Sequence, residues 1–226
     1  MRKTKIICTI GPTSESRDML ESLIEEGMNT ARLNFSHGCH EEHRARMDTI
    51  KEIRQKADKP VAILLDTKGP EIRTGKFKDK AVQLNKGDKF TLTVDEILGD
   101  NTICSVSYKN LNKDVVAGNI ILIDDGLIEL VVESIEGNNV HCIVNNSGII
   151  SNNKGVNIPN VKIKLPALTN KDIDDIIFGI ENDIDFLAAS FVRKASDILE
   201  IRRVLEKNNG TSISLISKIE NREAVE

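Results

Sequence analysis

The sequence lacks any long run of charge of one sign. Its 31 lysine and arginine residues nearly balance its 35 aspartate and glutamate residues, which gives a formal net charge of -4 at pH 7. Proteins that bind nucleic acid or an anionic membrane surface concentrate positive charge, and this chain does not. We therefore expect no nucleic acid and no membrane as partner, and any basic site in the protein must be local.

The sequence also has few cysteines and no long apolar segment. Its four cysteines, Cys8, Cys39, Cys104 and Cys142, show neither a CxxC pair nor the spacing of metal ligands. The apolar run after the first five residues is interrupted too soon to form the core of a signal peptide. No segment approaches the roughly 18 apolar residues of a membrane-spanning helix. We therefore predict a cytoplasmic protein with reduced thiols.

What the sequence does contain is an alternation of strand and helix signals in its first part. With 39% hydrophobic residues, its 226 residues are enough for a sizeable core. Short apolar runs predict strands at residues 5–10, 29–33 and 61–65. A first helix is predicted after a cap at Thr13 or Ser14. A second helix is predicted at residues 40–57, where Met47, Ile50 and Ile53 mark one face. Three such steps in a row favour a parallel sheet covered by helices.

From about residue 75 to residue 165 the pattern changes to β-branched runs at short intervals, which predict strands at residues 89–94, 102–106, 120–123, 129–134 and 140–144. Turn-forming clusters rich in glycine, asparagine and aspartate separate these runs. That spacing is typical of a small antiparallel barrel or sandwich. We therefore predict an inserted all-β domain at residues 71–166, between a first part at 1–70 and a continuation at 167–226.

After the insertion the alternation of helix and strand resumes. Thr169 is a candidate cap for the next helix, strands are predicted at residues 185–190 and 212–219, and a helix lies between them at 194–208. Five parallel strands are compatible with a doubly wound sheet or with part of a β/α barrel. A doubly wound sheet concentrates its site at one switch point, usually after a glycine-rich phosphate turn, and the sequence has no such turn.

Polar side chains at the predicted strand ends favour the barrel. Arg32, Asn34 and Ser36 follow the second strand at intervals of two, as Lys218 and Glu220 follow the fifth. A period of two sends alternate side chains to the same side of a strand. Functional groups at the carboxyl ends of several strands are what a β/α barrel active site requires. We therefore predict a partial barrel with about five of eight strands.

Each of these residues also has an ordinary interpretation when it is taken alone. Asp66 can cap a turn, Arg32 and Arg73 can be surface cations, and Lys218 can be solvated. His37 and His40 have no third ligand nearby in the sequence, which argues against zinc. The polar residues at the strand ends nevertheless share one predicted end of the barrel, its mouth. Together with the charged cluster between residues 66 and 73, this favours a site for ions and phosphate.

Five segments closely resemble the successive motifs of the pyruvate kinase family, in the family's order. They are Thr9-Ile10-Gly11-Pro12, Ala31-Arg32-Leu33-Asn34-Phe35-Ser36-His37-Gly38, Asp66-Thr67-Lys68-Gly69-Pro70-Glu71-Ile72-Arg73-Thr74-Gly75, Asp124-Asp125-Gly126 and Ser217-Lys218-Ile219-Glu220-Asn221. The resemblance covers the whole chain. It implies a β/α barrel with a mobile β-rich lid, and phosphoryl transfer from phosphoenolpyruvate to ADP in glycolysis.

The resemblance also implies cation sites. Glu220 would be one carboxylate ligand of a divalent ion, Mg²⁺ or Mn²⁺, and oxygen ligands suit such hard ions. Four residues resemble the family's K⁺ site, namely Asn34, Ser36, Asp66 and Thr67. Glu71 agrees with K⁺ dependence, because family members that dispense with K⁺ tend to have lysine there.

Further roles follow from the same resemblance. Lys218 and Arg32 would be catalytic, with Lys218 neutralising charge on the phosphoryl group in flight. Arg32 and Arg73 would bind phosphate groups, bidentate where geometry allows. The nucleotide would be approached by Asn34, His37 and, from the lid, Lys154. One of Asp124 and Asp125 would meet Arg32 when the lid closes.

The chain departs from the family pattern in one large respect. The family continues past this point with a Gly-Asp-Leu-Gly motif that supplies a second metal carboxylate, and a complete barrel typically needs about 250 residues. We therefore expect the 226 residues alone to be inactive. The resemblance further implies that the intact protein is a homotetramer. Two alternatives remain: a non-catalytic remnant that serves as a binding module, and another barrel enzyme that handles phosphoenolpyruvate or enolates.

Overall fold

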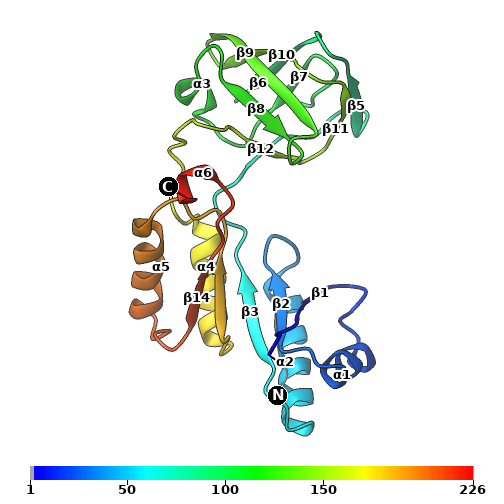
Figure 1. Cartoon of the computed structure of the whole chain (residues 1–226), viewed down its shortest axis with the longest axis vertical. Coiled ribbons are helices and arrows are strands. Elements are labelled where there is room, and N and C mark those ends of the chain that lie inside the picture. The colour runs from blue at the N-terminus through cyan, green and yellow to red at the C-terminus, as the bar shows by residue number, and fades with distance from the viewer. Residues whose placement is uncertain (1–2, 226) are drawn as a thin grey trace. The chain divides into compact units, whose positions relative to one another are not determined.

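A computed structural model describes residues 3–225. The chain divides into two compact units, which Figure 1 shows with the chain coloured from end to end. The α/β unit consists of Met1–Pro70 and Pro166–Glu226, and the β unit consists of Glu71–Leu165. The α/β unit is therefore discontinuous in sequence, and the β unit is inserted in it.

The α/β unit contains a five-stranded parallel sheet in the order β1-β2-β3-β13-β14. The strands are β1 (Ile7–Ile10), β2 (Thr30–Asn34), β3 (Ala62–Asp66), β13 (Phe186–Ala189) and β14 (Ser214–Ser217). The helices are α1 (Arg17–Glu25), α2 (His40–Lys56), α4 (Asn170–Glu181), α5 (Ala195–Lys207) and α6 (Arg222–Val225). The predicted partial β/α barrel is confirmed. Within residues 3–225, no helix combines the length and hydrophobicity needed to cross a membrane.

The two faces of this sheet differ as the alternation of side chains requires. Leu33 and Leu65 are fully buried in the core between strands and helices, together with Met47 and Ile50 of α2. The residues next to them along the strands point to the opposite face. Arg32 of β2 and Asp66 of β3 lie on that face, so the apolar pattern that builds the core also directs the polar groups to one side.

Helix α1 begins later than the sequence suggests. The expected cap was Thr13 or Ser14, but the structure places the cap at Ser16 and the first helical residue at Arg17. The Ser14 hydroxyl accepts a hydrogen bond from the Gly11 amide at 3.1 Å, and the Ser14 amide donates to the Gly11 carbonyl at 2.8 Å. Ser14 is thus committed to the turn after β1 and cannot cap the helix.

The start of α4 is fixed by a reciprocal cap, as predicted from Thr169. The Thr169 hydroxyl accepts from the Asp172 amide, and the Asp172 carboxylate accepts from the Thr169 amide at 2.9 Å. The other oxygen of Asp172 accepts from the buried Gly69 amide at 2.9 Å. Gly69 precedes the exit to the β unit, and Thr169 follows the return. One fully buried carboxylate therefore holds both chain segments that connect the units.

Replacing Asp172 by alanine should lower the free energy of unfolding by about 2–4 kcal/mol, because the helix loses its cap and the Gly69 amide loses its acceptor in a buried site. Urea unfolding followed by far-ultraviolet circular dichroism measures this, since the chain has no tryptophan. Asp174→Ala on the exposed side of the same helix is the control and should change stability by less than about 0.5 kcal/mol. Equal effects of the two substitutions would contradict the assigned role of Asp172.

The β unit is a small closed barrel. Its main sheet has the order β4-β12-β8-β9-β10-β6-β7, and β11 pairs with β5. A bridge between Thr74 and Val106, together with the bond from the Gly75 amide to the Ser105 carbonyl at 2.7 Å, joins the two ends of the main sheet. Of the two architectures that the sequence allows, barrel or sandwich, the structure has the barrel.

The elements of the β unit include five predicted strands and several unpredicted ones. The predicted strands are β6 (Lys89–Thr93), β7 (Ile103–Ser105), β8 (Ile120–Ile123), β9 (Ile128–Glu136) and β10 (Asn139–Val144). The others are β4 (Ile72–Arg73), β5 (Ala81–Leu84), α3 (Leu111–Asp114), β11 (Gly148–Ser151) and β12 (Gly155–Asn157).

Candidate active site

The carboxylate of Asp66 is the centre of a polar cluster at the carboxyl ends of the strands in the α/β unit. Its side chain is only 2% exposed. Arg32 donates to its Oδ2 through both Nε, at 2.7 Å, and Nη2, at 2.5 Å, so two guanidinium N–H groups share one carboxylate oxygen. Lys218 Nζ lies 3.0 Å from Oδ1 and 3.3 Å from Oδ2. A buried carboxylate is thereby compensated by two cations, which its burial requires.

Glu220 extends this cluster. Its Oε1 lies 3.5 Å from Lys218 Nζ, and its Oε2 accepts from the Phe191 amide at 2.8 Å. The side chains of Arg32, Lys218 and Glu220 are each about one third exposed, so they reach solvent where Asp66 does not. Two cations face two carboxylates, and the cluster has no net charge. The sequence could place four residues only at the same end of the barrel. The structure shows that they interact directly, and they are Arg32, Asp66, Lys218 and Glu220.

The cluster contains two further residues to which the sequence interpretation assigned no function, although Thr9 belongs to the first of the five motifs and Ser190 ends the strand predicted at residues 185–190. Ser190, directly after β13, donates to the Thr67 carbonyl at 2.6 Å and lies 2.8 Å from Lys218 Nζ. Thr9 of β1 accepts from Arg32 Nη1 at 2.8 Å. Both lie at carboxyl ends of strands, which is the signal that could have identified them. With them, all five strands of the sheet contribute to one cluster.

The remaining predicted residues of this unit lie beside the cluster. Asn34 pairs in register with Asp66 across β2 and β3, and its Oδ1 accepts from the Ser36 amide at 3.1 Å. The hydroxyl of Thr67 accepts from the Ser190 amide at 3.1 Å. His37 is exposed in the loop that follows β2. These residues surround the strand ends, while His37 stands apart from the cluster.

The donor chemistry of these groups fits the cations that the sequence implies. Each of the predicted K⁺ ligands, Asn34, Ser36, Asp66 and Thr67, has a side-chain oxygen that can coordinate a cation, and oxygen ligands suit hard ions. Around Glu220 the residues present supply part of a divalent site. Between residues 3 and 225 there is no group of three or more histidine, cysteine, aspartate or glutamate side chains arranged to hold a metal. Glu220 can therefore be one ligand among others.

Two predicted residues lie in the β unit. Arg73 donates through Nε to Glu71 at 2.6 Å and through Nη1 to the Asn153 carbonyl at 2.7 Å. The hydrogen bond to Glu71 raises the pKa of the Arg73 guanidinium, so Arg73 keeps its charge. Lys154 Nζ lies 3.0 and 2.8 Å from the two carboxylate oxygens of Asp124. Arg73 and Lys154 are thus both engaged within their own unit.

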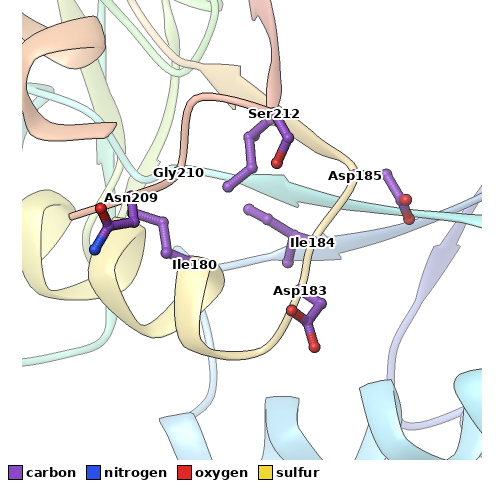
Figure 2. A pocket seen from close by; sticks show the side chains of 8 residues that line it. Ile180, Asp183, Ile184, Asp185, Asn209, Gly210 and Ser212 are labelled. Atoms are coloured by element: carbon purple, nitrogen blue, oxygen red, sulfur yellow. The ribbon is translucent and has the colours of Figure 1, made fainter. Parts of the chain in front are cut away.

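A pocket of about 240 Å³ lies at the amino ends of β13 and β14, and Figure 2 shows it from close by. Asp183 and Asp185 line one part of it, and Asn209 and Ser212 another. The Asp185 carboxylate is already occupied, because it accepts from the Ile63 amide at 2.7 Å and from Arg54 at 3.3 Å. This end of the sheet is opposite to the polar cluster, and in barrels it supports stability rather than chemistry.

Comparison with known proteins identifies the family. The model of the pyruvate kinase barrel domain matches residues 1–226, the entire chain. The chain belongs to the pyruvate kinase family. It is 56% identical over 227 residues to pyruvate kinase of Clostridium acetobutylicum, covering 100% of this chain and 48% of that protein. It is 54% identical over 228 residues to pyruvate kinase of Sporosarcina psychrophila and 56% identical over 228 residues to that of Staphylococcus saprophyticus, covering 39% of each.

The chain therefore spans about half the length, or less, of the curated pyruvate kinases that it matches. Family membership and the barrel fold apply to these 226 residues directly. Membership in a family of metal-dependent kinases implies metal cofactors, and it implies phosphoenolpyruvate and ADP as substrates of the family.

Proposed function

We propose that this chain forms part of an enzyme that transfers the phosphoryl group of phosphoenolpyruvate to ADP, which gives ATP and pyruvate. The observation that carries the proposal is the meeting of Asp66, Arg32 and Lys218 at the strand ends of a barrel. Membership in the pyruvate kinase family supports it independently.

In this reaction the bond between phosphorus and the enol oxygen breaks, and a terminal phosphate oxygen of ADP bonds to phosphorus. The enolate then takes a proton at its methylene carbon. Negative charge spreads over the oxygens in the transition state, so catalysis depends on positioned cations. We assign this role to the Lys218 ammonium, which Ser190 and Asp66 hold in place. Arg32 would hold the phosphate by its outer guanidinium edge.

Bound cations fit this assignment. Glu220 would hold Mg²⁺ or Mn²⁺, and Asn34, Ser36, Asp66 and Thr67 would hold K⁺. Such ions neutralise charge on the phosphate and enolate oxygens. The protein cluster cannot do this alone, because its two cations are balanced by Asp66 and Glu220. An anionic substrate needs further positive charge nearby.

The β unit would act as a lid and contribute to binding the phosphates of the nucleotide. Arg73 and Lys154 are the candidate cations. Lys154 is paired with Asp124, so nucleotide phosphate would have to compete with that carboxylate for the ammonium group. His37, exposed beside the strand ends, would contact the nucleotide together with Asn34. We further propose that the intact protein is a cytoplasmic homotetramer, which analytical ultracentrifugation of the gene product would test.

A coupled assay tests the proposed reaction. The complete product of the gene that encodes this chain should form ATP from phosphoenolpyruvate and ADP. Omitting Mg²⁺ should abolish the reaction, and replacing K⁺ by Na⁺ should slow it. If the folded gene product forms no ATP under any of these ionic conditions, the enzymatic proposal is wrong. ADP binding without turnover, measured by equilibrium dialysis, would then favour a binding module.

A further inference from the structure

The β2–α2 loop, residues 35–39, carries Ser36 and His37 and follows directly after Asn34. Its backbone is tied to three different elements. The Phe35 amide donates to the Asp66 carbonyl of β3 at 2.9 Å. The Phe35 carbonyl accepts from Lys171 of α4 at 3.0 Å. The His37 carbonyl accepts from a ring nitrogen of His43 in α2 at 2.9 Å.

His43 holds the outer part of this loop. The residue is only 2% exposed, and its ring stacks on Phe35 with centroids 3.9 Å apart and planes at 11°. Because a carbonyl can only accept, Nε2 must carry the proton that binds the His37 carbonyl. Burial lowers the pKa of the imidazole, which keeps the ring neutral in this tautomer.

The other ring nitrogen shows that a histidine at this position lowers the stability of the fold. His43 Nδ1 is buried, and among the residues 3–225 it has no hydrogen-bond partner. A buried polar atom without a partner destabilises the fold. An apolar side chain could stack on Phe35 and fill the same space without that penalty. The contact that only the imidazole provides is the hydrogen bond to the His37 carbonyl.

We infer that His43 is a positioning residue for the β2–α2 loop. At 2% exposure it offers no surface on which a substrate could bind. It fixes the His37 carbonyl, and through it the placement of Ser36 and the His37 side chain. The inference rests on the proposed function in one respect, because that function gives Ser36 and His37 their ligands, K⁺ and ADP. Ligand groups held in place by a supporting hydrogen bond bind more tightly than mobile ones, since less conformational freedom is lost on binding.

Three substitutions in the complete gene product separate this role from general stability. His43→Leu removes the hydrogen bond and retains an apolar side chain of similar size. His43→Gln retains an amide donor that can reach the His37 carbonyl. Met47→Ala lies one turn further along α2, where Met47 is fully buried in the core, and it removes packing while leaving the hydrogen bond from His43 to the His37 carbonyl in place.

We expect His43→Leu to raise the K⁺ activation constant and the KM for ADP by about tenfold, the size expected from one lost hydrogen bond. The kcat at saturating K⁺ and ADP should change by less than about threefold, because the reacting groups are untouched. His43→Gln should bring the K⁺ activation constant and the KM for ADP most of the way back to the values of the parent protein. Met47→Ala should lower the melting temperature and leave both constants unchanged. A folded His43→Leu variant with unaltered constants would overturn the inference, as would equal shifts in Met47→Ala.

Amide hydrogen exchange of residues 36–38 provides a readout that needs no activity. Exchange should be faster in His43→Leu than in the parent protein, and slow again in His43→Gln. If the parent forms no ATP but exchange follows this order, the proposed function fails and the positioning role stands. If the parent is active and exchange is the same in all variants, the positioning role fails and the function stands.

Discussion

Replacing Lys218 by methionine should lower the kcat for ATP formation by about three orders of magnitude or more. The substitution keeps the length and the apolar stem of the side chain but removes the ammonium group. That group is held 2.8 Å from Ser190 Oγ and 3.0 Å from Asp66 Oδ1, so it is fixed before any substrate arrives. Fixed charges that act on the transferring phosphoryl group contribute most in the transition state. The KM for phosphoenolpyruvate should therefore change much less than kcat.

Steady-state kinetics of the complete gene product would measure this loss. Lys207→Met, at the exposed end of α5, is a matched control that removes the same charge far from the strand ends. It should leave kcat within about twofold of the parent value. Lys218→Arg keeps a positive charge but replaces a compact ammonium by a planar guanidinium, so it should recover only a small part of the activity. A Lys218→Met enzyme with kcat within tenfold of the parent would remove Lys218 from the proposed mechanism.

Replacing Asp66 by asparagine should abolish measurable turnover and lower the free energy of unfolding by roughly 2–4 kcal/mol. Asparagine has almost the same shape but no charge, so Arg32 and Lys218 would face each other without their shared counter-ion. The expected cost is set below that of a fully buried pair, because the two cations are about one third exposed. Activity should fall as well, since Asp66 positions both cations.

Urea unfolding followed by circular dichroism measures the change in stability, with Asp183→Asn as the control. The Asp183 side chain is 88% exposed, and its loss should be nearly neutral. A double-mutant cycle sharpens the test. Arg32→Gln should cost less stability in the Asp66→Asn background than in the parent, because the two residues act as a pair. Additive effects of the two substitutions would show that the ion pair contributes little.

The α/β framework could be predicted because its strands and helices have strong local signals. Strand β3 is apolar up to Asp66 and lies between two proline-containing breakers, and α2 presents Met47, Ile50 and Ile53 at helical spacing. Both elements lie within one residue of the predicted bounds. The start of α1 was misplaced because Ser14 bonds within its own turn, and nothing in the local sequence distinguishes a turn serine from a cap serine.

The candidate site could be predicted only as a set of residues at one mouth. Side-chain alternation along each strand brings Arg32 and Lys218 to the side of the sheet where Asp66 ends β3. Which groups then pair depends on strand order, and Lys218 is 152 residues from Asp66 in the sequence. The role of His43 could not be predicted from the sequence. Its interaction with the His37 carbonyl involves the backbone, which leaves no trace in residue type.

The Asp172 carboxylate, which binds the Gly69 amide and caps α4 at Thr169, has a consequence for how this protein could have evolved. The two chain segments that join the units leave the α/β unit beside a single side chain. Because the Gly69 and Thr169 amides bind the same carboxylate, a barrel without the β unit would need only a short turn between them, and β3 and β13 could remain paired in their present register. Gain, loss or exchange of the inserted unit would therefore be a local event at one junction of the chain, and the barrel can be inherited while the insert diverges.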